Sequence, residues 1–183
     1  MADDIFFNDL RAPFISTNVA AVTLAATAKA LYTPSFFPVL GGQYFKFIGK
    51  KIKIRLFGRI TTGLTPGNGQ FTVFYGSGAD ATGVSLATSA AFALLPSQTD
   101  VSWMIELYIH CRSTGNTGTL FVDGEALFNE AVSVAHLLIP TSAPVVSGAC
   151  DLTAANIISV QFSRSGSTAE TMQVHDMEVI ALN

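Results

Sequence analysis

The chain has 183 residues, of which 49% are apolar and 13% are charged, and its net charge is −3. The length predicts a single domain that can bury a core without disulfides or metals. The negative charge disfavours binding to nucleic acid or to a membrane surface, and no run of 18 apolar residues predicts a transmembrane helix.

Charged residues are scarce, at about half the usual share of about 25%. Residues 60–79 and 81–99 contain none. A polar but uncharged surface fits burial between the subunits of an assembly, because charge is depleted from interface cores. The alternative is a free surface covered by Ser, Thr, Asn and Gly. The cysteines, Cys111 and Cys150, are too few for a disulfide framework, and we expect both to be reduced.

The first 38 residues are predicted to form an extended N-terminal arm that precedes the domain of residues 39–183. The acidic start, MADDIFFNDLR, lacks the basic region of a signal peptide, so we expect synthesis in a cytoplasm without export. Phe6 and Phe7 belong either to a frayed end or to an arm that docks on a neighbouring subunit. Residues 13–31 follow as an Ala- and Thr-rich arm or edge strand.

Residues 44–62, YFKFIGKKIKIRLFGRITT, predict a short lead-in strand and then the first long strand of a sandwich. Ile52, Ile54 and Leu56 alternate with cations, so the period of two places apolar side chains on one face and charge on the other. Six of the ten basic residues lie here: Lys46, Lys50, Lys51, Lys53, Arg55 and Arg59. They form either a solvated face with lysines guarding a sheet edge or a docking stripe for an acidic partner.

Short strands separated by turns continue through the chain. They are expected at residues 70–75, 84–95, 101–112, 119–128, 156–163 and 171–182. The turn TPGNG predicts an antiparallel hairpin between the basic strand and the next one. Trp103 is the largest inward side chain of its strand, and Asp176 marks a bulge in the last strand. About eight strands without a long helix predict an all-β, antiparallel β-sandwich, as a jelly roll rather than an immunoglobulin-like fold.

No group of residues in the sequence predicts catalysis. None of the three histidines has a partner at metal-ligand spacing, and no G-x-S-x-G motif is present. Asp123 and Glu125 share one strand face, which suits a solvated edge, a calcium site, or a glycosidase if a second wall faces them. We therefore expect no catalytic residue, no cofactor and no bound metal.

Several runs of the sequence resemble a widespread family of tailed-bacteriophage structural proteins. The runs are FIGKKIKIRLFGRITT, TPGNGQFTVFYG and WMIELYIHCRSTGNTGT. The first matches a strand of the type G-K-x-I-x-I-x-x-x-G-R-I, with which the compact β domain of the family begins. Further resemblance lies in Ile139-Pro140, Ala143-Pro144, Gln161-Phe162-Ser163 and the C-terminal Glu178 to Asn183. The resemblance spans most of the chain and implies a jelly-roll virion component.

The resemblance also implies a function without catalysis, inside a virion that is assembled in the cytoplasm of the host bacterium. The leading interpretation is a capsid cement or decoration protein, a homotrimer that clamps neighbouring capsid subunits through many modest contacts. Partner contacts are predicted at Phe6, Phe7, Lys46, Lys51, Lys53 and Arg55.

A tail or fibre module that binds a host-surface glycan is the alternative function. Tyr75 and Tyr108 are the candidate aromatic contacts for such a ligand. A groove that combines an exposed aromatic residue with ordered acidic residues would favour the glycan alternative. Flat, charge-poor surfaces on several sides would favour the cement interpretation.

Overall fold

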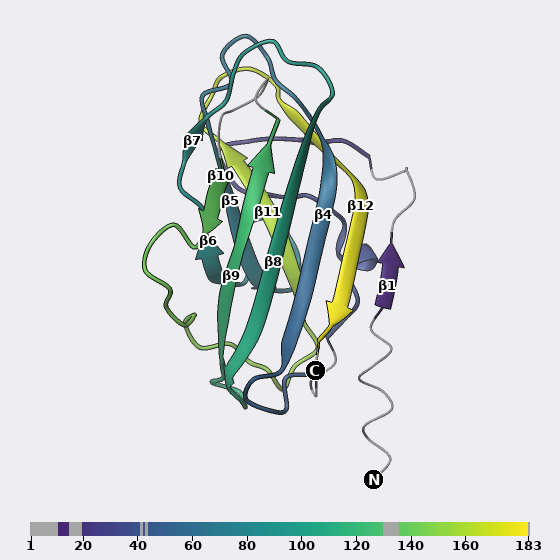
Figure 1. Ribbon diagram of the computed structural model, residues 1–183, viewed down its shortest axis with the longest axis vertical. Helices are drawn as coiled ribbons and strands as arrows, with labels where there is room; N and C mark the ends of the chain where they lie inside the picture. The colour runs from purple at the N-terminus through teal and green to yellow at the C-terminus, as the bar shows by residue number, and fades with distance from the viewer. Residues whose placement is uncertain (1–10, 15–19, 41, 43, 130–135, 183) are drawn as a thin grey trace.

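The computed structural model describes residues 11–14, 20–40, 42, 44–129 and 136–182, which form two antiparallel sheets packed face to face (Figure 1). Sheet A contains, in spatial order, β1 (Arg11–Phe14), β12 (Thr171–Ala181), β4 (Lys51–Thr61), β8 (Val101–Ser113), β9 (Thr119–Phe128) and β10 (His136–Ile139), with β2 (Val22–Thr23) also paired to β12. Sheet B contains β3 (Lys29–Ala30), β11 (Ile157–Arg164), β5 (Asn68–Gly76) and β6 (Val84–Thr88), with β7 (Phe92–Ala93) also paired to β5. The predicted all-β, antiparallel sandwich is confirmed.

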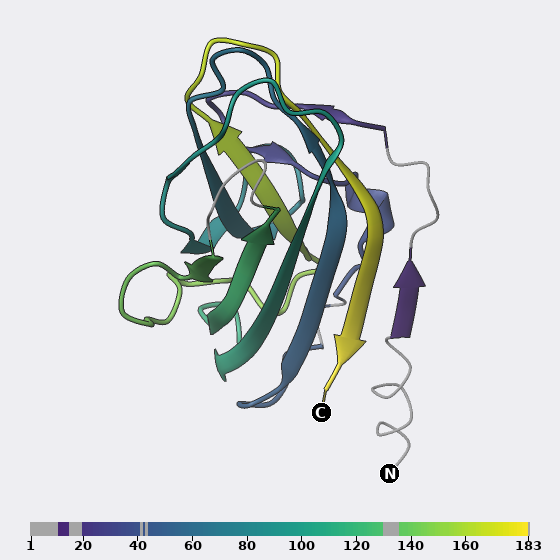
Figure 2. The same ribbon diagram turned by 45° about the horizontal axis from the view of Figure 1, so that its top comes forward.

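The long strands pair in a nested order. β4 pairs with β12, the last strand, and β5 pairs with β11, the strand before it. This nesting folds a two-stranded ribbon across two sheets, as in a jelly roll. β8, β9 and β10 instead follow one another as a meander at one side of sheet A. Figure 2 shows the two sheets as separate layers, with the loop of residues 140–149 projecting beside β10.

Helical structure in the described residues is limited to one short 3₁₀ turn, η1 (Pro34–Phe36). No helix in this part of the chain is long and apolar enough to span a membrane. Cys111 and Cys150 are both buried and form no disulfide, as expected.

β4 has the predicted alternation. Ile52, Ile54 and Leu56 are completely buried, and the cations between them lie on the face of sheet A turned away from sheet B, the outer face. The strand lies between β12 and β8, so its lysines do not guard an edge, and that interpretation is wrong. The predicted lead-in strand is also wrong. Tyr44 and Phe45 are consecutive and both buried, so the segment turns instead of alternating.

The predicted hairpin between β4 and β5 is wrong as well. β5 lies in sheet B, so the turn after β4 connects the two sheets. The alternation of β5 is nevertheless as predicted, with Phe71, Val73 and Tyr75 buried. Each strand has one apolar face, and these faces meet across the core. The ring centroid of Phe71 lies 5.9 Å from that of Trp103 on β8.

The described residues of the predicted arm lie on the sandwich itself. β1 and β2 pair with β12 at the edge of sheet A, and β3 pairs with β11. Leu24, Leu31 and Phe37 are buried in the same core as the long strands. The hydroxyl of Tyr32 donates to the carbonyl oxygen of Ile158, at 2.8 Å, and accepts from the backbone N–H of Val160. Residues 20–38 are therefore part of the sandwich and do not form an arm that ends at residue 38.

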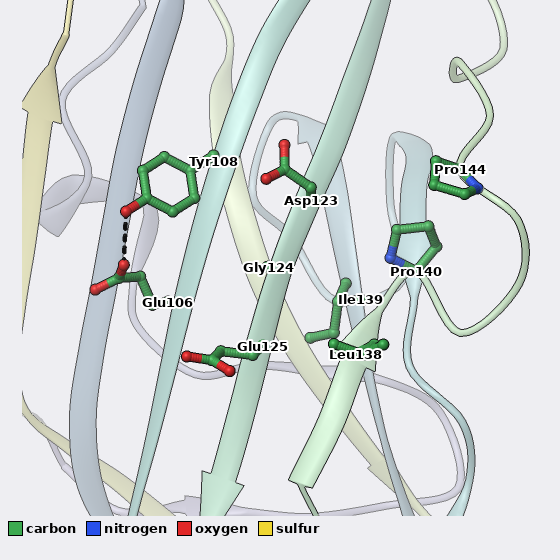
Figure 3. A pocket seen from close by; sticks show the side chains of 9 residues that line it. All are labelled: Glu106, Tyr108, Asp123, Gly124, Glu125, Leu138, Ile139, Pro140 and Pro144. Atoms are coloured by element: carbon green, nitrogen blue, oxygen red, sulfur yellow. Dashed lines mark hydrogen bonds between the residues drawn. The ribbon is translucent and has the colours of Figure 1, made fainter.

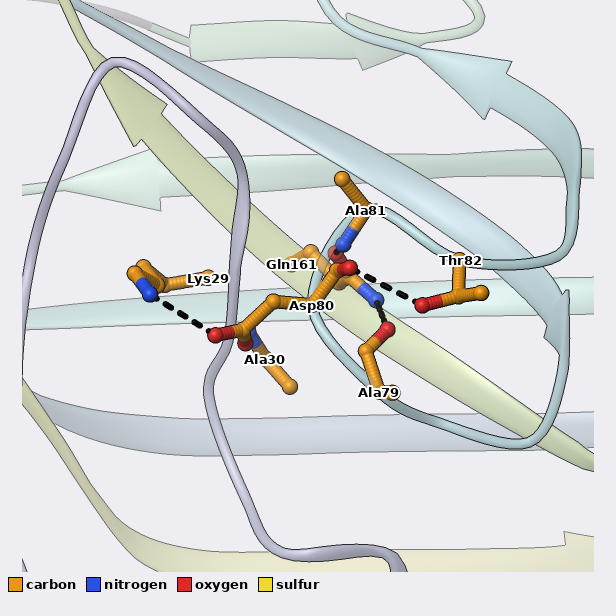
Figure 4. Close-up of polar contacts among 7 residues, drawn as sticks. All are labelled: Lys29, Ala30, Ala79, Asp80, Ala81, Thr82 and Gln161. Atoms are coloured by element: carbon orange, nitrogen blue, oxygen red, sulfur yellow. Dashed lines mark hydrogen bonds and ion pairs between the residues drawn. The ribbon is translucent and has the colours of Figure 1, made fainter.

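Both faces of β11 are buried, because the Gly-rich loop of residues 77–83 covers its outer side (Figure 4). The buried amide of Gln161 donates to the carbonyl oxygen of Ala79 at 3.0 Å and accepts from the N–H of Ala81 at 2.7 Å. Asp80 pairs with Lys29 at 2.8 Å and accepts the N–H of Ala30. These contacts give the loop a structural role, since they fasten it to β3 and β11.

The predicted bulge in β12 is confirmed, and it lies opposite Gly58. The register of β12 shifts between Val174 and Asp176, where the strand pairs with β4. A Cβ atom on Gly58 would lie 2.0 Å from the carbonyl oxygen of Gln173 and 2.9 Å from the ring of Trp103. Glycine is required here because β12 and the indole both approach its backbone.

Replacement of Gly58 tests this close packing. We expect Gly58→Ala to lower the free energy of unfolding by about 1–3 kcal/mol, the usual cost of overpacking a core. Urea denaturation followed by tryptophan fluorescence measures the change. Gly148→Ala is the matched control, because its Cβ would lie 3.8 Å from the nearest atom, in Val84. Equal stability of the two variants would contradict the close approach at Gly58.

Candidate functional site

The predicted partner contacts are only partly brought together by the structure. Lys51, Lys53 and Arg55 lie in a row on the outer face of β4. Lys46 is exposed in the turn before that strand. Phe6 and Phe7 lie outside the described residues. The candidate surface is therefore the outer face of sheet A, with β4 near its centre.

The neighbouring strand β8 places acidic and aromatic residues beside the cations. The register sets Lys53 beside Tyr108 and Arg55 beside Glu106. Lys53 Nζ lies 2.8 Å from Glu106 Oε2, and the Tyr108 hydroxyl donates to Glu106 Oε1 at 2.7 Å. The ammonium group of Lys51 lies 4.6 Å from the centroid of the Tyr108 ring. Lys51 and Lys53 are thus engaged within the chain, while Arg55 is exposed beside them.

β9 adds the next row of the face. Asp123 lies opposite Tyr108, and Glu125 lies opposite Glu106. Each of these two carboxylates contacts a histidine on a neighbouring strand. His110 Nε2 lies 2.7 Å from Asp123 Oδ1, and His136 Nε2 lies 2.5 Å from Glu125 Oε2. For His110 and His136, the pairing of strands in the sheet supplies a carboxylate that is distant in sequence.

A groove of about 350 Å³ runs over β8, β9 and β10 (Figure 3). Its floor carries Glu106, Tyr108, Asp123 and Glu125 from β8 and β9. The opposite wall is apolar and consists of Leu138, Ile139, Pro140 and Pro144. Its volume lies in the range of about 300–1,000 Å³ that is typical of small-molecule sites. A second wall therefore faces Asp123 and Glu125.

Ionisation in the groove follows from these contacts. The hydrogen bond from Lys53 holds the pKa of Glu106 below its ordinary value, assisted by the Tyr108 hydroxyl. Burial lowers the pKa of His110, although the charge of Asp123 opposes the shift. At neutral pH, Glu106 is therefore a carboxylate and His110 is uncharged. A carboxylate with a lowered pKa does not serve as the general acid of a glycosidase, which needs a raised one.

The glycan candidates Tyr75 and Tyr108 have opposite environments. Tyr75 is buried in the core, and burial raises its pKa to about 12. Tyr108 lies on the outer face and lines the groove. Tyr108 is therefore available to a ligand, whereas Tyr75 is not. Among the residues that the structure describes, no group of three or more His, Cys, Asp or Glu side chains is placed to hold a metal ion.

Comparisons with known proteins identify no relative in sequence. No protein-family model matches the chain, and no curated protein does. Among solved structures, the chain is similar to a legume lectin-like domain from Entamoeba histolytica, with 11% identity, a TM-score of 0.32, and coverage of 94% of this chain and 89% of that one. A likeness this weak carries no argument about function. The β-sandwich stands on its own strand pairing.

The ion pair between Lys53 and Glu106 makes a testable contribution to stability. We expect Glu106→Gln to lower the free energy of unfolding by about 1 kcal/mol at pH 7, as for a well-formed but partly exposed pair. Because the pKa of Glu106 is lower in the folded state, its stabilisation is full above the unfolded value and is lost as the pH falls through the folded value. The deficit of the variant should therefore shrink in acid.

Urea denaturation at neutral pH and in acid, below the folded pKa of Glu106, measures this deficit. Asp176→Asn serves as a control, because Asp176 is an exposed carboxylate on the same sheet. An equal loss for Glu106→Gln at both pH values would contradict an ionic origin.

Proposed function

We propose that this chain is a non-enzymatic structural subunit of a tailed-phage virion, a cement or decoration protein that contacts neighbouring subunits at both ends of its sandwich. The resemblance of its sequence to phage structural proteins supports the virion, and its low content of charge supports extensive subunit contacts. The observation that carries the proposal is that five of its exposed apolar side chains lie near the two ends of β4.

The first apolar end surrounds the start of β4. Phe47 and Ile48 are 65% and 72% exposed in the turn that precedes this strand. Leu182, 44% exposed, lies beside them in the fold, because its backbone N–H donates to the carbonyl oxygen of Lys51 at 3.0 Å. We name these three residues the lower end.

The second apolar end surrounds the C-terminal end of β4. Leu64 is 77% exposed and Leu95 is 41% exposed. The loops that carry them are joined, since the Thr62 hydroxyl donates to the carbonyl oxygen of Leu95 at 2.7 Å and the N–H of Ser97 donates to the carbonyl oxygen of Gly63 at 2.8 Å. We name Leu64 and Leu95 the upper end.

The two ends are separated by the length of β4. Its 11 residues span about 35 Å at the usual rise of a strand. Apolar surface at both ends of a domain lets one subunit hold two neighbours at once. Two modest contacts then act together and bind far more tightly than either one alone, which is how a cement protein clamps a shell. The trimer implied by the family resemblance would multiply the same effect.

Several basic residues pair with carboxylates of the same chain, so we expect the apolar ends to contribute most of the free energy of association. Four basic residues are paired with carboxylates of the same chain: Lys29, Lys53, Arg59 and Arg164. Paired charges attract a partner less strongly than free ones do. Apolar contacts at the ends, rather than the basic row, are therefore the proposed basis of assembly.

Substitution at each end tests the proposal. We expect the protein to form a trimer or a larger species, measured by light scattering, and to sediment with phage heads assembled without it. Phe47→Ser with Ile48→Ser should weaken head binding at least about tenfold, and so should Leu64→Ser with Leu95→Ser, because each pair removes one of two linked contacts. These side chains are exposed, so the thermal unfolding of the variants should be close to that of the natural chain.

Val145→Ser is the matched control, since Val145 is 63% exposed on the loop beside the groove and belongs to neither named end. A stable monomer that does not sediment with heads would overturn the proposal. If Val145→Ser lost head binding while the variants of the two ends kept it, the contact with the head would lie on the face of sheet A instead of at the ends.

A saccharide-binding module of a tail or fibre is the second candidate. One specific observation favours it, namely the groove in which Tyr108 lies beside ordered carboxylates. The two functions use different surfaces, so one chain can perform both.

A further inference from the structure

We propose that the groove over β8, β9 and β10 is a binding site for a neutral saccharide. The site does not include the apolar ends, so the proposal of this site and the proposed role in assembly are tested separately. The groove combines three features that suit such a ligand: hydrogen-bond acceptors in its floor, an aromatic ring, and an apolar wall.

The floor has acceptors that are held in place and still able to bind. Asp123 uses Oδ1 for His110, and Glu125 uses Oε2 for His136. These contacts engage one oxygen of each carboxylate, and Asp123 Oδ2 and Glu125 Oε1 are the oxygens proposed to accept from ligand hydroxyls. Charge-assisted hydrogen bonds of this kind are about twice as strong as neutral ones. Positioned acceptors also save the entropy of ordering side chains when the ligand binds.

Glu106 has a different task, because both of its oxygens are already engaged. Oε2 pairs with Lys53, and Oε1 accepts the hydroxyl of Tyr108. The second contact orients the Tyr108 ring on the floor of the groove. Figure 3 shows Tyr108 and Pro140 on opposite sides of Asp123. A ligand that binds Asp123 therefore lies between an aromatic ring and an apolar wall.

The apolar wall matches the C–H surface of a sugar ring. Leu138 is 68% exposed, and it lines the groove together with Pro140 and Pro144. Proline rings are rigid and lose little conformational entropy when they are covered. A pyranose presents hydroxyl groups at its rim and C–H groups on its faces. Such a molecule can meet the carboxylates and the apolar wall at the same time.

The charges in and around the groove favour a neutral ligand. On β4, β8 and β9, the three rungs that cross the floor carry the cations Lys51, Lys53 and Arg55 and the carboxylates Glu106, Asp123 and Glu125. The cations lie on β4, and the charged side chains that line the groove itself are the carboxylates. An anionic sugar would lie against these carboxylates, and a cationic one would meet Lys53, which already pairs with Glu106. A polyhydroxylated ligand without charge avoids both repulsions.

Nuclear magnetic resonance titration of the full chain tests the site. The neutral probes are glucose, galactose, mannose and N-acetylglucosamine, each to about 50 mM, because single-sugar sites are often of millimolar affinity. Glucuronic acid and glucosamine are the charged probes. We expect at least one neutral sugar to shift the amide signals of Tyr108, Asp123 and Gly124, and we expect the charged forms to bind at least about tenfold more weakly.

Variants of the floor separate the contributions. Tyr108→Ala and Asp123→Ala should each weaken binding at least about tenfold, since each removes a central contact. Tyr108→Phe keeps the ring and should stay within about threefold of the natural chain. Lys46→Ala, exposed in the turn before β4, is the control and should bind normally. Unchanged thermal unfolding of each variant confirms that the fold is intact.

Three results would overturn the site. They are an absence of shifts with all four neutral sugars, tighter binding of a charged sugar than of any neutral one, and normal binding by both Tyr108→Ala and Asp123→Ala. None of them bears on the assembly role, which is measured by mass and by head binding.

Discussion

The central strand β4 imposes the constraint on which the rest of the structure depends. Ile52, Ile54 and Leu56 are fully buried, and the strand is bonded to β12 on one side and β8 on the other. A slip of one residue would turn its cations into the core, so the apolar row fixes the register of sheet A. The same register sets Lys53 beside Tyr108 and thereby builds the groove floor on the opposite face.

Local patterns predict which side chains are buried, but they do not predict which strands pair. The period of two identifies the inward rows of β4, β5 and β8, and the break at Asp176 identifies the bulge. The hairpin between β4 and β5 is wrong because a turn can join strands in one sheet or in two sheets, and its sequence does not distinguish them. The segment before residue 38 lacks alternation because it contributes short strands and isolated buried residues to two sheets.

The sequence predicts only some of the residues that form the groove. The spacing of Asp123 and Glu125 indicates a shared face, and Tyr108 was a candidate aromatic residue. The contacts of His110 and His136 depend on strand register, and the apolar wall depends on β10 and the loop after it. One signal could have identified more of the site. Glu106, Tyr108 and His110 share the outer face of β8, and a cationic strand face calls for such a neighbour.

We thus propose two separate surfaces, the apolar ends for assembly and the groove over β8, β9 and β10 for a ligand. A cryo-electron microscopy reconstruction of the proposed assembly, a phage particle that contains this chain, tests that separation most directly. We predict neighbouring subunits against Phe47 and Ile48 at one end and against Leu64 and Leu95 at the other, with the groove at Tyr108 open to solvent. Density from a capsid subunit filling the groove, with both ends exposed, would contradict the account.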